Sequence, residues 1–124
     1  ILFSSDFGIL SEQTIAQEMT RLHLVESSPD EYDYHEKSMR SAYADFLDFV
    51  ELVKRIDADL EFPPLIIRPH PSEDIRHWHR HLGALRRVKV LFEGEISPWL
   101  YASSGLMHRG CTTAVQAYVG KTPV

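Results

Sequence analysis

The sequence predicts an α/β domain of three layers with a mostly parallel sheet. Short apolar runs alternate with segments of helical pattern, and several of these runs end in a polar turn that contains glycine or proline. The chain has 124 residues, of which 44% are apolar and 25% charged, so we expect one compact domain with a core of its own. The expected order is strand, helix, strand, helix, strand, short helix, strand, helix, strand.

In the first half, the apolar run 1–3 breaks into a polar loop over 4–8, as a buried strand does at its end. Residues 9–28 are only weakly patterned. From about 35 to 56, apolar residues recur every three or four positions with charges between them, which predicts an amphipathic helix. The acidic stretch before this helix is rich in Ser, Pro and Asp and predicts a surface loop whose acids favour the helix N-terminus.

In the second half, Pro63 and Pro64 exclude a helix, and β-branched runs then alternate with helix-start signals. Strands are expected at 65–67, 88–92 and 105–107, and helices at 72–82, 97–100 and 112–119. This alternation is typical of a Rossmann-like domain, in which ligands bind beyond the carboxyl ends of parallel strands. Polar residues and glycines gather at four of these ends, which are residues 6–8, 68–71, 93–95 and 108–110.

The charge of the chain excludes a general attraction to nucleic acid. Thirteen Lys and Arg against eighteen Asp and Glu give a formal net charge of −5. Residues 26–36 hold five acids and no Lys or Arg, whereas residues 68–89 hold six Lys and Arg and two acids. An anionic ligand is therefore expected to bind the second half of the chain.

Cysteine content and hydropathy predict the compartment. The single cysteine, Cys111, cannot form an intramolecular disulfide, which suits a reducing environment. No apolar run approaches the ~20 residues that a membrane helix needs, and no secretory signal opens the chain. We therefore expect a cytoplasmic location. Ile1 lies inside a predicted strand and another apolar run begins at Val124, so we expect a piece of a longer protein.

The turn His-Arg-Gly-Cys-Thr-Thr at 108–113 predicts a phosphate site. Its glycine lets the backbone approach a ligand closely, and the first N–H groups of the following helix are unpaired at the positive end of the helix dipole. In the structural alternative, Thr112 is only an N-cap and His108 only a histidine at a strand end. A Walker loop is excluded, because no glycine-rich loop ends in Lys-Ser or Lys-Thr.

The segment Arg68-Pro69-His70-Pro71 predicts a second site at a neighbouring strand end. Prolines on both sides of His70 restrict its backbone and fix the direction of its imidazole. An imidazole held in this way can donate a hydrogen bond or a proton to a leaving phosphate. In the alternative interpretation, the prolines simply end the strand and His70 caps a loop.

Two further patterns favour structure over chemistry. His77, His79 and His81 do not share one helix face, and no carboxylate or cysteine completes a set of metal ligands, so we expect a solvated basic face. Cys111 lacks the base and orienting group that a nucleophile needs. It is expected to be a small buried residue at a helix start.

Three sequence blocks together resemble bacterial surface carbohydrate biosynthesis proteins. They are Arg-Pro-His-Pro at 68–71, Pro-Trp-Leu-x-Ala-Ser at 98–103, and a C-terminal block that opens with His-x-Gly-Cys-Thr-Thr at 108–113 and closes with Gly-Lys-x-Pro-Val at 120–124. Such proteins are similar to the C-terminal, donor-binding half of GT-B glycosyltransferases, including the sialyl-, polysialyl- and glycerophosphotransferase-like groups with a His-Pro and a paired Ser/Thr motif. The resemblance is close over 65–124 and loose over 1–64.

The resemblance implies an enzyme that transfers a sugar or a polyol phosphate from a nucleotide to a glycan acceptor. The enzyme would need no metal and no cofactor, and its donor is expected to be linked to CMP or CDP. A missing N-terminal acceptor domain is implied as the partner, and the cytoplasmic face of the inner membrane as an alternative location. His70 would contact the donor phosphate and assist the leaving group. Asp6 would be a second catalytic residue, and it would face the cleft between the domains together with Gly8. The remaining donor contacts would be Arg68, His108, Gly110, Thr112 and Thr113 at the phosphates, Gly94 in the loop 93–96 near the base, and Gln116 at the ribose.

Two departures from the family pattern qualify this expectation. Gln116 stands where many GT-B proteins have a glutamate, so its contact with the ribose would lack charge assistance. The acceptor domain, which supplies the general base in the sialyltransferase-like groups, is absent, so this chain alone is expected to bind a nucleotide and to be catalytically incomplete. Two other functions stay open, a GT-B-like nucleotide-sugar 2-epimerase and a noncatalytic nucleotide-binding domain.

Overall fold

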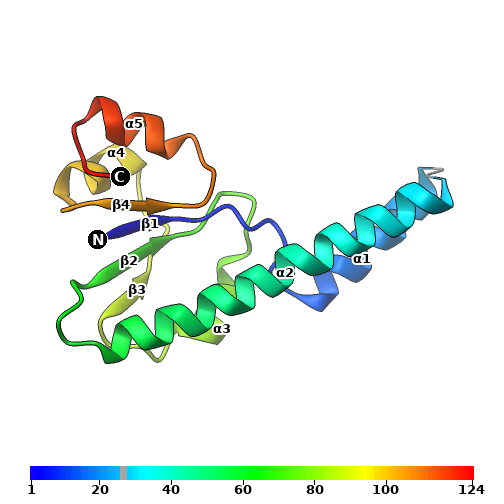
Figure 1. Ribbon diagram of the computed structural model, residues 1–124, viewed down its shortest axis with the longest axis horizontal. Coiled ribbons are helices and arrows are strands. Elements are labelled where there is room, and N and C mark those ends of the chain that lie inside the picture. Colours follow the sequence, from blue (N-terminus) through cyan, green and yellow to red (C-terminus); the bar gives the residue numbers. More distant parts are fainter. Residues whose placement is uncertain (26–27) are drawn as a thin grey trace.

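A computed structural model, which describes residues 1–25 and 28–124, shows a three-layer α/β domain. Four strands form one fully parallel sheet in the order β3-β2-β1-β4, with helices on both faces (Figure 1). The predicted fold class is therefore confirmed. The strands are β1 (Leu2–Ser4), β2 (Leu65–Arg68), β3 (Val88–Val90) and β4 (Leu106–His108). The helices are α1 (Glu12–Leu24), α2 (Pro29–Ala58), α3 (Ile75–Leu82), α4 (Ile96–Ala102) and α5 (Thr113–Val119).

Each face of the sheet has its own apolar cluster. Successive strand residues point to opposite faces, so Leu2 packs with α4 and α5 whereas Phe3 packs with α2 and α3. Figure 1 shows α4 and α5 above the sheet and α2 and α3 below it. Burial on both faces explains why β2 is a continuous apolar run without polar alternation. The larger cluster is centred on Phe46 and Trp78, both 0% exposed.

Helix α2 begins earlier than the sequence predicts. Ser28 and Glu31 form a capping box, in which the Ser28 hydroxyl accepts from the Glu31 N–H at 3.3 Å and the Glu31 carboxylate accepts from the Ser28 N–H at 2.9 Å. Pro29 occupies the first helical position. The loop expected before residue 35 is therefore wrong from Pro29 onward, because its acids and proline start a helix. Residues 26 and 27 of that expectation lie outside the described residues.

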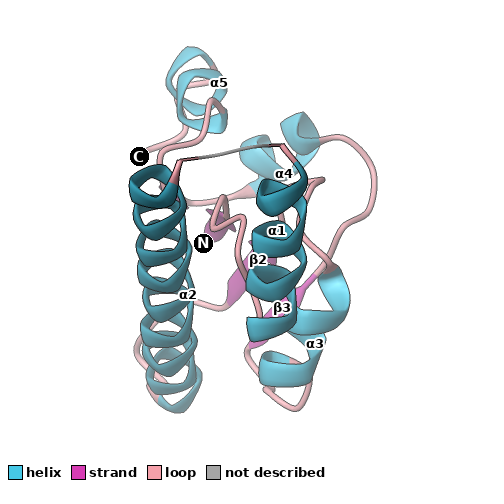
Figure 2. Ribbon diagram, turned by 90° about the vertical axis from the view of Figure 1, so that its right-hand side faces the viewer, coloured by secondary structure: helices cyan, strands magenta, loops and turns pink. Residues whose placement is uncertain are grey.

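Helix α1 lies within the segment 9–28, to which the sequence assigned no element. The Ser11 hydroxyl caps it by accepting from the Thr14 N–H at 3.1 Å. Of its own residues only Ile15 and Met19 are buried, so the apolar repeat is too sparse to mark a helix. Figures 1 and 2 show α1 alongside the first half of α2, and an ion pair of 3.2 Å joins Glu12 to Arg40.

The remaining differences concern element ends. Helix α3 begins at Ile75, because the side chain of Asp74 accepts from the Arg76 N–H and makes Asp74 the N-cap. Strand β3 ends at Val90 and not at residue 92. Among the described residues no strand follows α5, although one was expected there. None of the described helices combines the length and apolar character that a membrane crossing requires.

Candidate functional site

A cavity of about 620 Å³ lies at the carboxyl ends of the strands. Strand β1 pairs with β2 on one side and with β4 on the other, so the strand order reverses at β1. Doubly wound sheets open a ligand crevice at this switch point. The segments that follow all four strands contribute to the lining, which is Ser4, Asp6, residues 68–71, Phe92, residues 94–97, residues 110–113 and Gln116.

The cavity brings together most of the residues that the sequence proposes as a site. His108 is one exception, because it ends β4 as an exposed residue and is not part of the lining. Gly8 also lies outside the lining. Those that line the cavity are Asp6, Arg68, His70, Gly94, Gly110, Thr112, Thr113 and Gln116.

Arg68 places a buried positive charge at the wall of the cavity. The residue is 7% exposed, and its guanidinium donates to the carbonyl oxygens of Glu93 at 2.6 Å and Gly94 at 2.8 Å. No carboxylate lies within ion-pair distance of Arg68 in the described part of the chain. Burial lowers the pKa of the guanidinium, since the charged form loses solvation. An anion in the cavity would offset this charge.

The turn before α5 offers backbone N–H groups to the same cavity. Gly110 has φ +68°, a conformation that favours glycine. The N–H groups of residues 110–113 have no acceptor within residues 1–25 and 28–124. Two hydrogen bonds join strand β1 to the turn. The Ser4 hydroxyl donates to the Thr113 hydroxyl oxygen and accepts from the Cys111 thiol, each at 3.3 Å. Cys111 is half-buried, less than the sequence predicts.

His70 lies exposed at the rim of the cavity with a defined tautomer. The backbone N–H of Ser72 donates to Nδ1 at 3.2 Å, and the Ser72 hydroxyl lies 2.7 Å from the same nitrogen. Nδ1 is therefore an acceptor, and the neutral ring carries its proton on Nε2. His70 thus has a ring N–H that is not used by the loop and is available to a ligand.

Glu73 organises the site and was not found from the sequence. This buried carboxylate accepts from the N–H groups of Phe7 at 2.6 Å and His70 at 3.1 Å, and from the Trp78 indole at 3.1 Å. It also accepts from the Ser5 hydroxyl and the Gly8 N–H. It thereby joins the loop after β1 to the loop after β2. Nothing in the sequence distinguishes this acid from one that merely begins a helix, so no local signal identifies it.

The histidines of α3 are less solvated than predicted. His79 is exposed, but His77 and His81 are half-buried, and the His81 ring lies 5.4 Å from the Phe46 ring. Burial, followed by the nearby charges of Lys54 and Arg80, lowers the pKa of His81. Within the described residues, no three His, Cys, Asp or Glu side chains form a group that could hold a metal ion.

The site therefore combines a buried guanidinium, unpaired backbone N–H groups and an imidazole N–H around one cavity. All three are hydrogen-bond donors, and the first is a full positive charge, so the arrangement suits a phosphate or another multiply charged oxyanion. Asp6 and Glu95 at the same cavity are exposed acceptors that suit hydroxyl groups. Comparison with family models, curated proteins and solved structures finds no match to this chain.

Proposed function

We propose that the cavity binds the nucleotide-sugar donor of a metal-independent, GT-B-like glycosyltransferase of bacterial surface polysaccharide biosynthesis. The chain would be the donor-binding half of that enzyme. The observation that carries this proposal is Arg68, a buried cation without a carboxylate partner in the described residues, at the same cavity as the unpaired N–H groups of residues 110–113. The sequence blocks 68–71 and 108–113, which resemble those of surface carbohydrate enzymes, support a sugar donor in particular.

In this proposal the donor phosphates lie between Arg68 and the turn 110–113. The unpaired N–H groups hold phosphate oxygens, and the guanidinium offsets their charge. Gln116 on α5 contacts the ribose hydroxyls, and Gly94, which follows β3 with φ +65°, lies near the base. Thr112 is exposed at the cavity and its side chain caps nothing, so its hydroxyl is available to the phosphates.

His70 would assist departure of the nucleotide by hydrogen bonding. When the bond between the anomeric carbon and the phosphate oxygen breaks, the electron pair goes to that oxygen, and the acceptor hydroxyl oxygen bonds to the anomeric carbon. The Nε2–H of His70 stabilises the negative charge that develops on the phosphate. A neutral ring that released this proton would become an anion, so the tautomer inferred from the Ser72 N–H contact favours hydrogen-bond donation over proton transfer. The base that takes the proton of the acceptor hydroxyl would come from the acceptor domain.

Calorimetric titration with CMP, CDP, UDP and GDP tests the proposal. Selective binding of one nucleotide is expected, and Thr112→Ala should weaken it roughly fivefold to tenfold because one phosphate hydrogen bond is lost. Thr20→Ala is the matched control, since Thr20 lies on α1 and its hydroxyl donates only to the Ala16 carbonyl. Absence of binding to all four nucleotides by the folded chain would contradict the proposal.

The reaction class is tested separately, on an assembly that contains the acceptor domain. Release of free nucleotide together with formation of a glycoside would support transfer. Entry of solvent deuterium at C2 of the sugar would instead indicate a nucleotide-sugar 2-epimerase. If the intact protein carrying His70→Ala retained its full biological activity, the noncatalytic alternative would be favoured, because the proposal requires the imidazole N–H at the leaving phosphate.

A further inference from the structure

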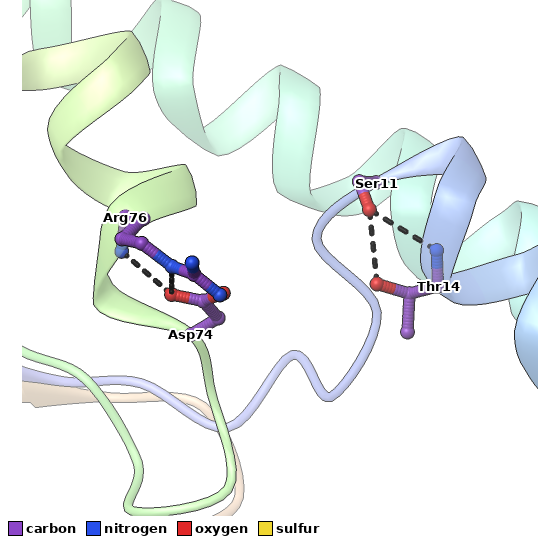
Figure 3. Close-up of polar contacts among 4 residues, drawn as sticks. All are labelled: Ser11, Thr14, Asp74 and Arg76. Atoms are coloured by element: carbon purple, nitrogen blue, oxygen red, sulfur yellow. Dashed lines mark hydrogen bonds and ion pairs between the residues drawn. The ribbon is translucent and has the colours of Figure 1, made fainter.

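A second hollow, separate from the main cavity, lies between α1 and α3. This groove has a volume of about 350 Å³. Figure 3 shows its two sides, with Ser11 and Thr14 at the start of α1 and Asp74 and Arg76 at the start of α3. The complete lining is Ser11, Gln13, Thr14 and Gln17 from the α1 side and Asp74, Arg76, His77 and Arg80 from the α3 side.

The α3 side of the groove carries an unbalanced positive charge. Asp74 and Arg76 neutralise each other, because the guanidinium donates to both carboxylate oxygens, at 2.9 Å and 2.6 Å. Arg80, one helical turn further on, is exposed and has no carboxylate within ion-pair distance in residues 1–25 and 28–124. The guanidinium of Arg80 is therefore available to an anion at this groove.

His77 adds an unsatisfied polar atom to the same side. Its Nδ1 is buried and has no hydrogen-bond partner, and it is the only buried side-chain nitrogen or oxygen of this kind in the described residues. Burial of a polar atom without a partner costs free energy, which a ligand or a bound water would recover. This atom belongs to a residue that lines the groove next to Arg76.

The α1 side is neutral and rich in groups that bind hydroxyls. Gln13 and Gln17 are exposed, and the hydrogen bonds of the described residues leave their side-chain amides unused. Amide and hydroxyl side chains both donate and accept, as sugar and polyol hydroxyls require. No Phe, Tyr or Trp side chain lines the groove, which disfavours a nucleobase as its ligand.

We propose that this groove binds a sugar or polyol that carries a carboxylate or a phosphate, with Arg80 holding the anionic group and the α1 amides holding hydroxyls. The two sites are neighbours through one loop, since His70 lines the main cavity and Asp74 lines the groove. The groove proposal stands on its own residues and does not require that the main cavity bind a nucleotide.

NMR titration of the chain tests the groove with two acids and their neutral counterparts. N-acetylneuraminic acid supplies a carboxylate and glycerol 1-phosphate supplies a phosphate, while N-acetylmannosamine and glycerol lack the charge. We expect at least one acid to shift the backbone amides of residues 13–17 and 76–80, and the neutral compounds to shift them little. Shifts with N-acetylneuraminic acid alone would identify a carboxylate ligand, shifts with glycerol 1-phosphate alone a phosphate ligand, and shifts with both a groove that accepts either anion.

Substitution of Arg80 tests the role assigned to its guanidinium. Arg80→Gln should weaken binding of the acid roughly tenfold, whereas His79→Gln, the exposed neighbour outside the groove, should leave it within about twofold. Absence of amide shifts in the groove with both acids, or equal binding by Arg80→Gln and the unsubstituted chain, would overturn the proposal. Nucleotide affinity measured on the same samples reports on the main cavity separately, so failure of one site is distinguishable from failure of the other.

Discussion

The carboxylate of Glu73 accepts a hydrogen bond of 3.1 Å from the backbone N–H of His70, and thereby fixes the rim of the main cavity from inside the domain. The same carboxylate binds the N–H of Phe7 in the loop that follows β1. One buried acid therefore holds two strand-end loops at a fixed separation. The imidazole at the rim owes its position to this contact as well as to the prolines on either side of it.

Replacement of Glu73 by Gln should destabilise the fold and disturb the cavity together. Both carboxylate oxygens accept only, so the amide NH2 of Gln would face donor N–H groups and leave them unpaired in a buried place. We expect the free energy of unfolding to fall by about 2–4 kcal/mol in urea denaturation. Glu61→Gln, at an exposed position, is the matched control. Equal stability of the two variants would contradict the organising role of Glu73.

Replacement of Arg68 by Met should separate ligand binding from stability. Met keeps an apolar stem of similar length but removes the charge. The fold loses the two hydrogen bonds of Arg68, and removal of a desolvated cation offsets part of that loss of stability. Nucleotide affinity should fall roughly tenfold or more, while the free energy of unfolding changes by no more than about 2 kcal/mol. Calorimetry and denaturation measure the two quantities, with exposed Arg55→Met as the control. Unchanged nucleotide affinity would show that Arg68 only holds the loop 93–94 by its hydrogen bonds and does not bind the nucleotide.

Acid should remove the contribution of Asp74 to stability. The side-chain hydrogen bond from Arg76, assisted by the Arg76 N–H, lowers the pKa of Asp74 from 3.8 to about 2. A carboxyl group with a lowered pKa stabilises the fold above its unfolded value and loses that effect as the pH falls through the folded value. The difference in Tm between the unsubstituted chain and Asp74→Asn should therefore be constant above about pH 5 and decline between about pH 4 and pH 2. A difference that does not change over this range would exclude the ion pair as its source.

Two neighbouring positions on α2 test the placement of the larger apolar cluster. Phe46 is 0% exposed and packs against Trp78, with ring centroids 5.0 Å apart, whereas Leu47 is 37% exposed. Phe46→Ala should lower the free energy of unfolding by about 3–5 kcal/mol, and Leu47→Ala by less than about 1 kcal/mol. Similar losses at the two positions would mean that α2 is rotated relative to the sheet.

The strands were predictable because each lies in a short apolar run that ends in a polar turn, and most of α2 because its apolar residues recur every three or four positions. Helix α1 was not predictable, since only Ile15 and Met19 are buried and its N-cap, Ser11, lies in a segment without a clear apolar repeat. The cavity-lining strand ends followed from the rule that parallel strands end at one edge. The position of His108 outside the lining was not predictable, because the sequence does not show the direction that the chain takes between β4 and α5.

The most direct measurement is an NMR titration of the backbone amides of residues 110–113 with CMP, CDP, UDP and GDP, each paired with the nucleoside that lacks the phosphate. The account predicts that at least one nucleotide shifts these four amides strongly and that its nucleoside does not, because the unpaired N–H groups bind the phosphate. If none of the nucleotides shifts them, or if a nucleoside shifts them as strongly as its nucleotide, then the turn is not a phosphate site and the central claim is wrong.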